Sequence, residues 1–168
     1  QCSADYDTTN DITKVFFATV QNKLHWAISK QTAAEIIYSR INSKKPNMGL
    51  TSWKNAPKGS IRKTDVSIAK NYLDEKELDQ LNRFVTMYLD YAEIQAMNGK
   101  IMYMKDWVEK LNAFLQFNER DVLDNPGKVS AELAKTFAEA EFKKYSTIQD
   151  RLLKSDFDRE VEKMSKHS

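Results

Sequence analysis

Apolar residues recur at helical spacing along most of this chain. Between about Asn10 and Ser29 they follow one another at intervals of four, with two more beside them: Ile12, Phe16, Val20, Leu24 and Ile28, then Val15 and Ala27. This spacing predicts an amphipathic helix. A second helix is predicted from about Thr32 to Ile41, where small alanines allow close packing.

Three longer helices are predicted further along. Asp74 and Glu77 have capping-box spacing and open a helix that ends near Asn98. The next helix runs from about Met104 to Leu123, and Ser130 can cap a last one over residues 131–164. The predicted inward faces are Leu78, Leu81, Val85, Tyr88, Leu89 and Ala92; then Val108, Leu111, Leu115 and Val122, broadened by Trp107, Phe114 and Phe117; then Leu133, Phe137, Tyr145, Ile148, Leu152 and Val161.

Residues 42–63 break the helical pattern. They hold two of the three prolines and two of the four glycines, so they are predicted to form a long loop. Thr64 can cap a short helix that follows, to about Tyr72. The whole pattern predicts an all-α fold: a bundle of about five to six helices with a long basic loop after the second helix. We expect one domain over residues 10–168, preceded by a linker end at residues 1–9.

Composition narrows the class of protein. Apolar residues make up 41% and charged residues 30%, as in a folded domain, and 4 glycines argue against a turn-rich sandwich. The lone Cys2 fits a reducing compartment. No stretch approaches the roughly 18 apolar residues of a bilayer span, and no signal segment opens the chain. These features, and a first residue that is not Met, predict a soluble cytoplasmic piece of a longer protein, without a membrane partner.

Charge is unevenly distributed. Residues 40–70, which we call the basic segment, hold eight basic residues and one acid, Asp65, for a net +7 against −5 elsewhere. Lysine and arginine attract phosphates, and an exposed tryptophan can stack on a base. DNA or an acidic protein surface is therefore a possible partner, although basic loops are also often merely solvated. The candidate contact residues are Arg40, Lys44, Lys45, Trp53, Lys54, Lys58, Arg62, Lys63 and Lys70.

Two polar groups are candidates for a pocket. His25, Thr32 and Glu35 lie near the turn between the first two helices; the alternative is a buried histidine with Gln31 or Thr32 capping the second helix. Asp90 and Asp106, with Tyr91 and Glu93 beside Asp90, could act as paired acids. The alternative places these acids on helix surfaces, with Asp106 favourable in a first turn.

No recognised catalytic or cofactor motif is present. The chain has no glycine-rich phosphate loop, no Gly-x-Ser-x-Gly elbow and no Glu-x-x-His pairs of a ferritin-like metal site. The sequence therefore predicts no cofactor and no metal site, and leaves an enzymatic role uncertain.

Several passages together resemble one family. They are FFATVQNKLHWAI, QTAAEIIYSR, KPNMGLTSWK, IAKNYL, LNRFVTMYLDYAE, MKDW, FLQFNERDVL and IQDRLLKSDFD, between Phe16 and Asp158. The combination is similar to the C-terminal domain of the RhuM family of bacterial virulence proteins. In that family a part similar to a winged or helix-turn-helix DNA-binding module precedes this region. The resemblance implies a bacterial cytoplasmic protein in a DNA-related context, and it supplies no activity and no site residues.

Three hypotheses follow. The first is a non-catalytic binding module that uses the basic segment. The second is an enzyme or toxin-like effector with an unfamiliar polar site, for which His25, Glu35, Asp90 and Asp106 are the candidates. The third is an oligomerisation domain, because a last helix of on the order of 50 Å at 1.5 Å per residue exceeds a compact bundle of this size and could pair with a second copy.

Overall fold

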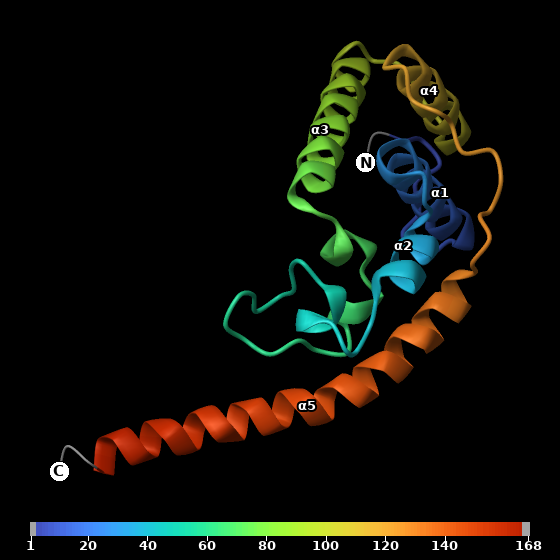
Figure 1. Cartoon of the computed structure of the whole chain (residues 1–168). Helices are drawn as coiled ribbons and strands as arrows, with labels where there is room; N and C mark the ends of the chain where they lie inside the picture. The colour runs from blue at the N-terminus through green and yellow to red at the C-terminus, as the bar shows by residue number, and fades with distance from the viewer. Residues whose placement is uncertain (1–2, 166–168) are drawn as a thin grey trace. The chain divides into compact units, whose positions relative to one another are not determined.

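The computed structural model describes residues 3–165, which form helices and connecting segments without a strand (Figure 1). The all-α prediction is confirmed. The α-helices are α1 (Asp11–Ser29), α2 (Ala33–Arg40), α3 (Glu75–Met97), α4 (Met104–Phe117) and α5 (Ala131–Ser165). Three short 3-10 helices lie between α2 and α3: η1 (Pro46–Gly49), η2 (Asp65–Ser67) and η3 (Ala69–Tyr72).

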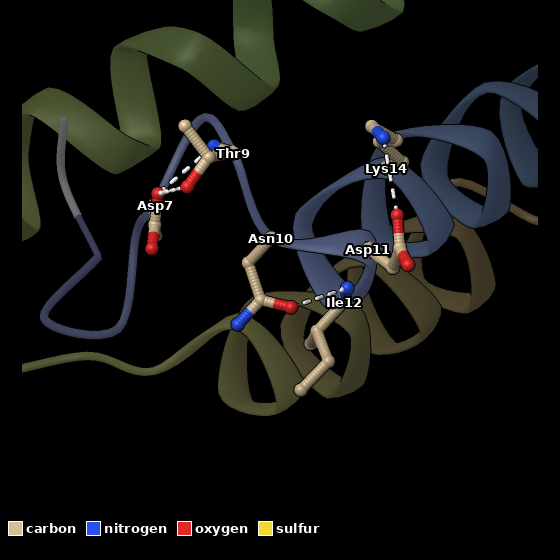
Figure 2. Close-up of polar contacts among 6 residues, drawn as sticks. All are labelled: Asp7, Thr9, Asn10, Asp11, Ile12 and Lys14. Carbon is tan, nitrogen blue, oxygen red and sulfur yellow. Dashed lines mark hydrogen bonds and ion pairs between the residues drawn. The ribbon is translucent and has the colours of Figure 1, made fainter.

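Two helix starts are set by side chains that the sequence identifies. The Asn10 side-chain oxygen accepts a hydrogen bond from the Ile12 N–H at 3.0 Å at the start of α1 (Figure 2). At the start of α3, the Glu77 N–H donates to the Asp74 carboxylate at 2.8 Å and the Asp74 N–H donates to Glu77 at 3.0 Å. The predicted capping box is therefore present.

The end of α4 differs from its prediction. The helix stops at Phe117 rather than near Leu123, because Glu119 adopts a left-handed conformation with φ of 58°. The Arg120 N–H then donates to the Leu115 carbonyl at 2.9 Å, and the Glu119 N–H to the Gln116 carbonyl at 3.0 Å. These two bonds form a Schellman motif, which usually has glycine at the left-handed position. Because this position holds a glutamate, the residue type does not predict the helix end.

The chain divides into two compact units. Among the described residues, unit 1 comprises 3–35 and 73–130, and unit 2 comprises 36–72 and 131–165. Unit 1 holds α1, α3 and α4; unit 2 holds most of α2, the three 3-10 helices and α5. The chain passes between the units three times without a composition break, so the sequence pattern contains no signal of this division.

In unit 1, α1 packs against both α3 and α4. The buried faces follow the helical period. The predicted residues Leu24, Ala27, Leu81, Tyr88, Trp107, Leu111 and Leu115 are buried, and Phe84, which was not predicted, is buried with them. Four predicted core residues are instead exposed: Ile12 and Val15 in the first turns of α1, Leu89 on α3, and Phe117 at 87% exposure. The described part of the predicted linker end lies against the start of α4, where the Met104 N–H donates to the Asp5 carboxylate at 2.9 Å.

In unit 2, α5 contacts η1 and η2. The buried residues of α5 are Ala134, Ala138 and Glu141, and the Phe137 ring packs against Tyr38 at 4.7 Å between centroids. Leu133, Ile148, Leu152 and Val161, predicted to face inward, are exposed. Small alanines carry the contact because they allow a helix to approach an irregular backbone closely.

Candidate functional site

The single acid of the basic segment holds its backbone in place. Asp65 is 3% exposed, and its carboxylate accepts hydrogen bonds from two backbone amides, Lys54 N–H at 3.1 Å and Arg62 N–H at 2.8 Å. A buried carboxylate is tolerated when such donors surround it. Its negative charge is therefore directed at peptide groups inside the segment rather than at the cations on its surface.

Trp53 also belongs to this framework. Its indole is 9% exposed, and Nε1–H donates to the Gly59 carbonyl at 2.7 Å. Other apolar side chains of the segment are buried too: Met48, Leu50, Ile61 and Val66. The predicted loop is thus a packed segment with its own small core. The indole face of Trp53 is not available for stacking on a base, which corrects its place among the candidate contacts.

Side chains of α5 fasten the segment from outside. The Ile61 N–H donates to the Gln149 side-chain oxygen at 2.8 Å, and the Gln149 amide N–H donates back to the Ile61 carbonyl at 3.2 Å. Further along α5, the carboxylate of Glu141 accepts the Ser43 N–H at 2.7 Å and the Lys144 ammonium at 2.6 Å. Backbone amides at four positions of the segment (residues 43, 54, 61 and 62) therefore donate to side-chain acceptors.

The Glu141 anchor is pH-dependent. The hydrogen bond from Lys144, and then that from the Ser43 N–H, lower the pKa of Glu141 from 4.5 to about 2. A carboxyl group whose pKa is depressed by folding contributes stability above its unfolded pKa, and that contribution is lost as the pH falls through the folded value. The stabilisation by Glu141 is therefore complete above about pH 5 and disappears between pH 4.5 and about 2.

We predict that Glu141→Gln lowers the free energy of unfolding by about 2 kcal/mol at pH 7, allowing for the solvent around Lys144. The difference from the unchanged protein should shrink as the pH falls from 5 towards 2. Urea titrations at several pH values measure it. Asp150→Asn, at an exposed position in the middle of the same helix, is the matched control and should change stability little at any pH. A Glu141→Gln effect that is constant with pH would contradict this assignment.

The eight cations of the basic segment fall into two groups. Arg40 is half-buried and donates to the Tyr72 carbonyl at 3.0 Å, and Lys63 pairs with Glu139 of α5 at 3.2 Å. Both therefore have structural partners. The other six side chains are exposed, and no acidic side chain of the described residues lies within ion-pairing distance of them: Lys44, Lys45, Lys54, Lys58, Arg62 and Lys70.

The rest of unit 2 does not offset this charge. Residues 131–168 carry eight basic and eight acidic side chains, so the net +7 of unit 2 comes from the basic segment. Unsatisfied surface cations on an ordered backbone raise the local concentration of anions. The basic segment therefore presents a positively charged surface on an ordered backbone.

The polar residues near the first helix turn have structural roles. The Glu35 N–H donates to Thr32 Oγ1 at 3.3 Å and the Thr32 N–H donates to Glu35 at 2.9 Å, so Thr32 caps α2. The other Glu35 oxygen accepts the Lys128 N–H at 2.6 Å. These bonds outweigh burial and hold the pKa of Glu35 below its usual value. Gly127 lies so close that a Cβ there would come within 2.7 Å of Thr32 Cγ2.

The other pocket candidates do not gather into a described cleft. His25 is buried within α1, and Asp90 is exposed on α3. Asp106 accepts the Tyr103 N–H at 2.9 Å in the first turn of α4, as its surface alternative predicts. Among residues 3–165, no three His, Cys, Asp or Glu side chains come close enough to hold a metal ion. Glu35 and Asp106 are thus engaged with backbone amides, and nothing in their geometry favours proton transfer.

One cleft in unit 1 was not anticipated. It has a volume of about 450 Å³ and lies between α1 and the segment after α4; Val15, Ala18, Thr19, Asn22, Lys23, Leu123, Asp124, Asn125 and Pro126 line it. Lys23 is 9% exposed and donates to the Leu123 carbonyl at 2.7 Å. Burial lowers the pKa of Lys23, and the charge of Asp124 opposes that shift. Lys23 thereby ties the segment after α4 to α1, a contact across 100 residues that leaves no local signal.

Comparison with known proteins places the chain. The model of the Virulence protein RhuM family matches residues 1–154. No curated protein and no solved structure gives a significant match. In the part of the chain that the structure describes, no helix combines the length and apolarity that crossing a membrane requires. The match covers most of the sequence, including all the passages that carry the resemblance except the last four residues of the final one. The chain therefore belongs to the Virulence protein RhuM family.

Proposed function

We propose that this chain is a non-catalytic binding module that contacts nucleic acid through the basic segment. One observation carries the proposal: six exposed cations stand on a hydrogen-bonded backbone with no acidic side chain of the described residues in ion-pairing distance, while the only acid of the segment is buried. Phosphates spaced along a polymer suit such a surface because each contact releases condensed counterions.

The ordering of the segment supports the same function. A flexible lysine-rich loop loses conformational entropy when it binds, whereas an ordered backbone has lost most of that freedom on folding. Asp65, Glu141 and Gln149 hold the backbone of the basic segment at separate points. The bacterial, DNA-related context that the family resemblance implies agrees with a nucleic-acid partner, and an acidic protein surface is the alternative.

Lysine footprinting tests where nucleic acid is bound. When the chain is saturated with a 20-base-pair duplex and treated with an acylating reagent, we expect Lys44, Lys45, Lys54 and Lys58 to lose reactivity, measured by mass spectrometry. Lys76, Lys100, Lys105 and Lys110 of unit 1 are equally exposed and serve as internal controls. Equal protection of both sets, or protection of the controls alone, would mean that the basic segment is not the contact surface.

A second candidate function is self-association through α5. Beyond Gln149 this helix exposes a set of large apolar side chains: Leu152, Leu153, Phe157 and Val161. Apolar side chains gathered on a solvated helix are a frequent mark of a contact surface. Light scattering over a hundredfold range of concentration distinguishes the cases, since a mass that stays monomeric would remove this candidate. Self-association would use α5 rather than the basic segment, so it is compatible with nucleic-acid binding.

A further inference from the structure

We infer that the nucleic acid bound by the basic segment is a duplex, contacted through its phosphates without regard to base sequence. The inference rests on the proposed function and adds the class of ligand. It follows from three features of the segment: where its aromatic rings lie, how short its helices are, and which cations it exposes.

The first feature is the position of the aromatic rings. Trp53 is the aromatic residue within the basic segment; Tyr38 lies just before it, with its ring packed against Phe137, and Tyr72 just after it. Trp53 is 9% exposed and Tyr72 is 2% exposed, with the Tyr72 hydroxyl donating to the Val66 carbonyl at 2.7 Å. Proteins that bind single strands stack successive bases on exposed aromatic side chains, and each stacked base contributes substantially to affinity. The basic segment offers no such ring.

The second feature is the length of its helices. Sequence-specific readers place a recognition helix or a two-stranded ribbon in the major groove, where several side chains reach base edges. The 3-10 helices within and just after the segment have 4, 3 and 4 residues, and no strand is present among residues 3–165. These elements are too short to present base-reading side chains along a groove, whereas their lysines can still reach phosphates.

The third feature is the kind of cation. Six of the eight basic residues are lysines, which act as point charges on flexible stems. Arginine is the residue that reads guanine through two parallel hydrogen bonds. Of the two arginines, Arg40 donates to the Tyr72 carbonyl, and Arg62 alone is exposed. Lysines bind phosphates by charge, and a duplex has the higher charge density, with one phosphate charge per about 1.7 Å. This composition therefore favours double-stranded nucleic acid.

The test compares four ligands at about 0.1 M salt, by fluorescence anisotropy with the whole chain: two 20-base-pair duplexes of unrelated sequence, one of their single strands, and polyglutamate of similar length. We expect both duplexes to bind with affinities within about threefold of each other, and the single strand to bind at least tenfold more weakly, as its lower charge density and the absent stacking imply.

Failures of the two proposals are distinguishable. A single strand that binds as tightly as the duplexes, or a tenfold preference for one duplex sequence, would overturn the inference while leaving nucleic-acid binding in place. If no oligonucleotide binds, or if polyglutamate displaces the duplex at equal charge concentration, nucleic-acid binding itself is wrong and an acidic protein surface becomes the better partner.

Discussion

Asp65→Ala is expected to lower the free energy of unfolding by about 3 kcal/mol, because two backbone amides inside the basic segment lose a charged acceptor together. The amides are those of Lys54 and Arg62, and the carboxylate that receives them is 3% exposed. Urea unfolding followed by circular dichroism measures the loss.

The Asp65→Ala substitution also distinguishes the effect of an ordered backbone on binding from the effect of net charge. Asp65→Ala makes the segment more positive by one unit, so a purely electrostatic account predicts tighter binding to nucleic acid. If the ordered backbone matters, affinity falls although no cation has been removed. Asp158→Ala, at an exposed position of α5, adds the same charge and is the matched control, with stability expected to stay within about 0.5 kcal/mol. Equal stability of the two variants would show that Asp65 does not hold the segment.

Local patterns in the sequence were enough to predict where the α-helices lie. They were wrong for residues 64–72, which form two 3-10 helices without a capping hydrogen bond from the Thr64 side chain. The interval of four predicts α1 almost to the residue. The spacing of Asp74 and Glu77 predicts the start of α3, because the hydrogen bonds involved span only three residues. The end of α4 could not be predicted in this way. It depends on a left-handed glutamate, Glu119, and most helices that end so use glycine or asparagine.

Burial was harder to predict than helix formation. Periodicity shows that a helix has an apolar face, and it does not show whether a partner covers that face along its whole length. Leu89 and Phe117 are exposed for this reason, and on α5 the alanines at 134 and 138 are buried while Leu133 and Leu152 are not. The buried set depends on tertiary neighbours, which a one-dimensional pattern does not specify.

The candidate site was predicted in part. The cluster of cations could be found from the sequence alone, because counting charges along the chain is enough to locate it. The framework beneath them was missed: Glu141 and Ser43 are 98 residues apart, and Gln149 and Ile61 are 88 apart, so neither pair leaves a local signal. Trp53 was assigned to the surface because it lies among lysines, and the structure shows a buried residue whose Nε1–H donates to the Gly59 carbonyl.

The second large effect concerns binding. Replacing Lys44, Lys45, Lys54, Lys58 and Arg62 together by alanine is expected to weaken duplex binding at least a hundredfold at about 0.1 M salt, since each phosphate contact adds about 0.9 to the slope of log affinity against log salt. The side chains are exposed, so helicity should not change. Replacing Lys76, Lys100, Lys105, Lys110 and Lys128 of unit 1 removes the same charge and is the control.

The most direct measurement is therefore the salt dependence of duplex affinity for these three proteins side by side. Binding through the basic segment predicts that the slope falls by about 4 to 5 in the first variant and stays near that of the unchanged chain in the control. Three slopes that agree, or a control that loses as much affinity as the first variant, would show that the cations of residues 40–70 are not where nucleic acid is held.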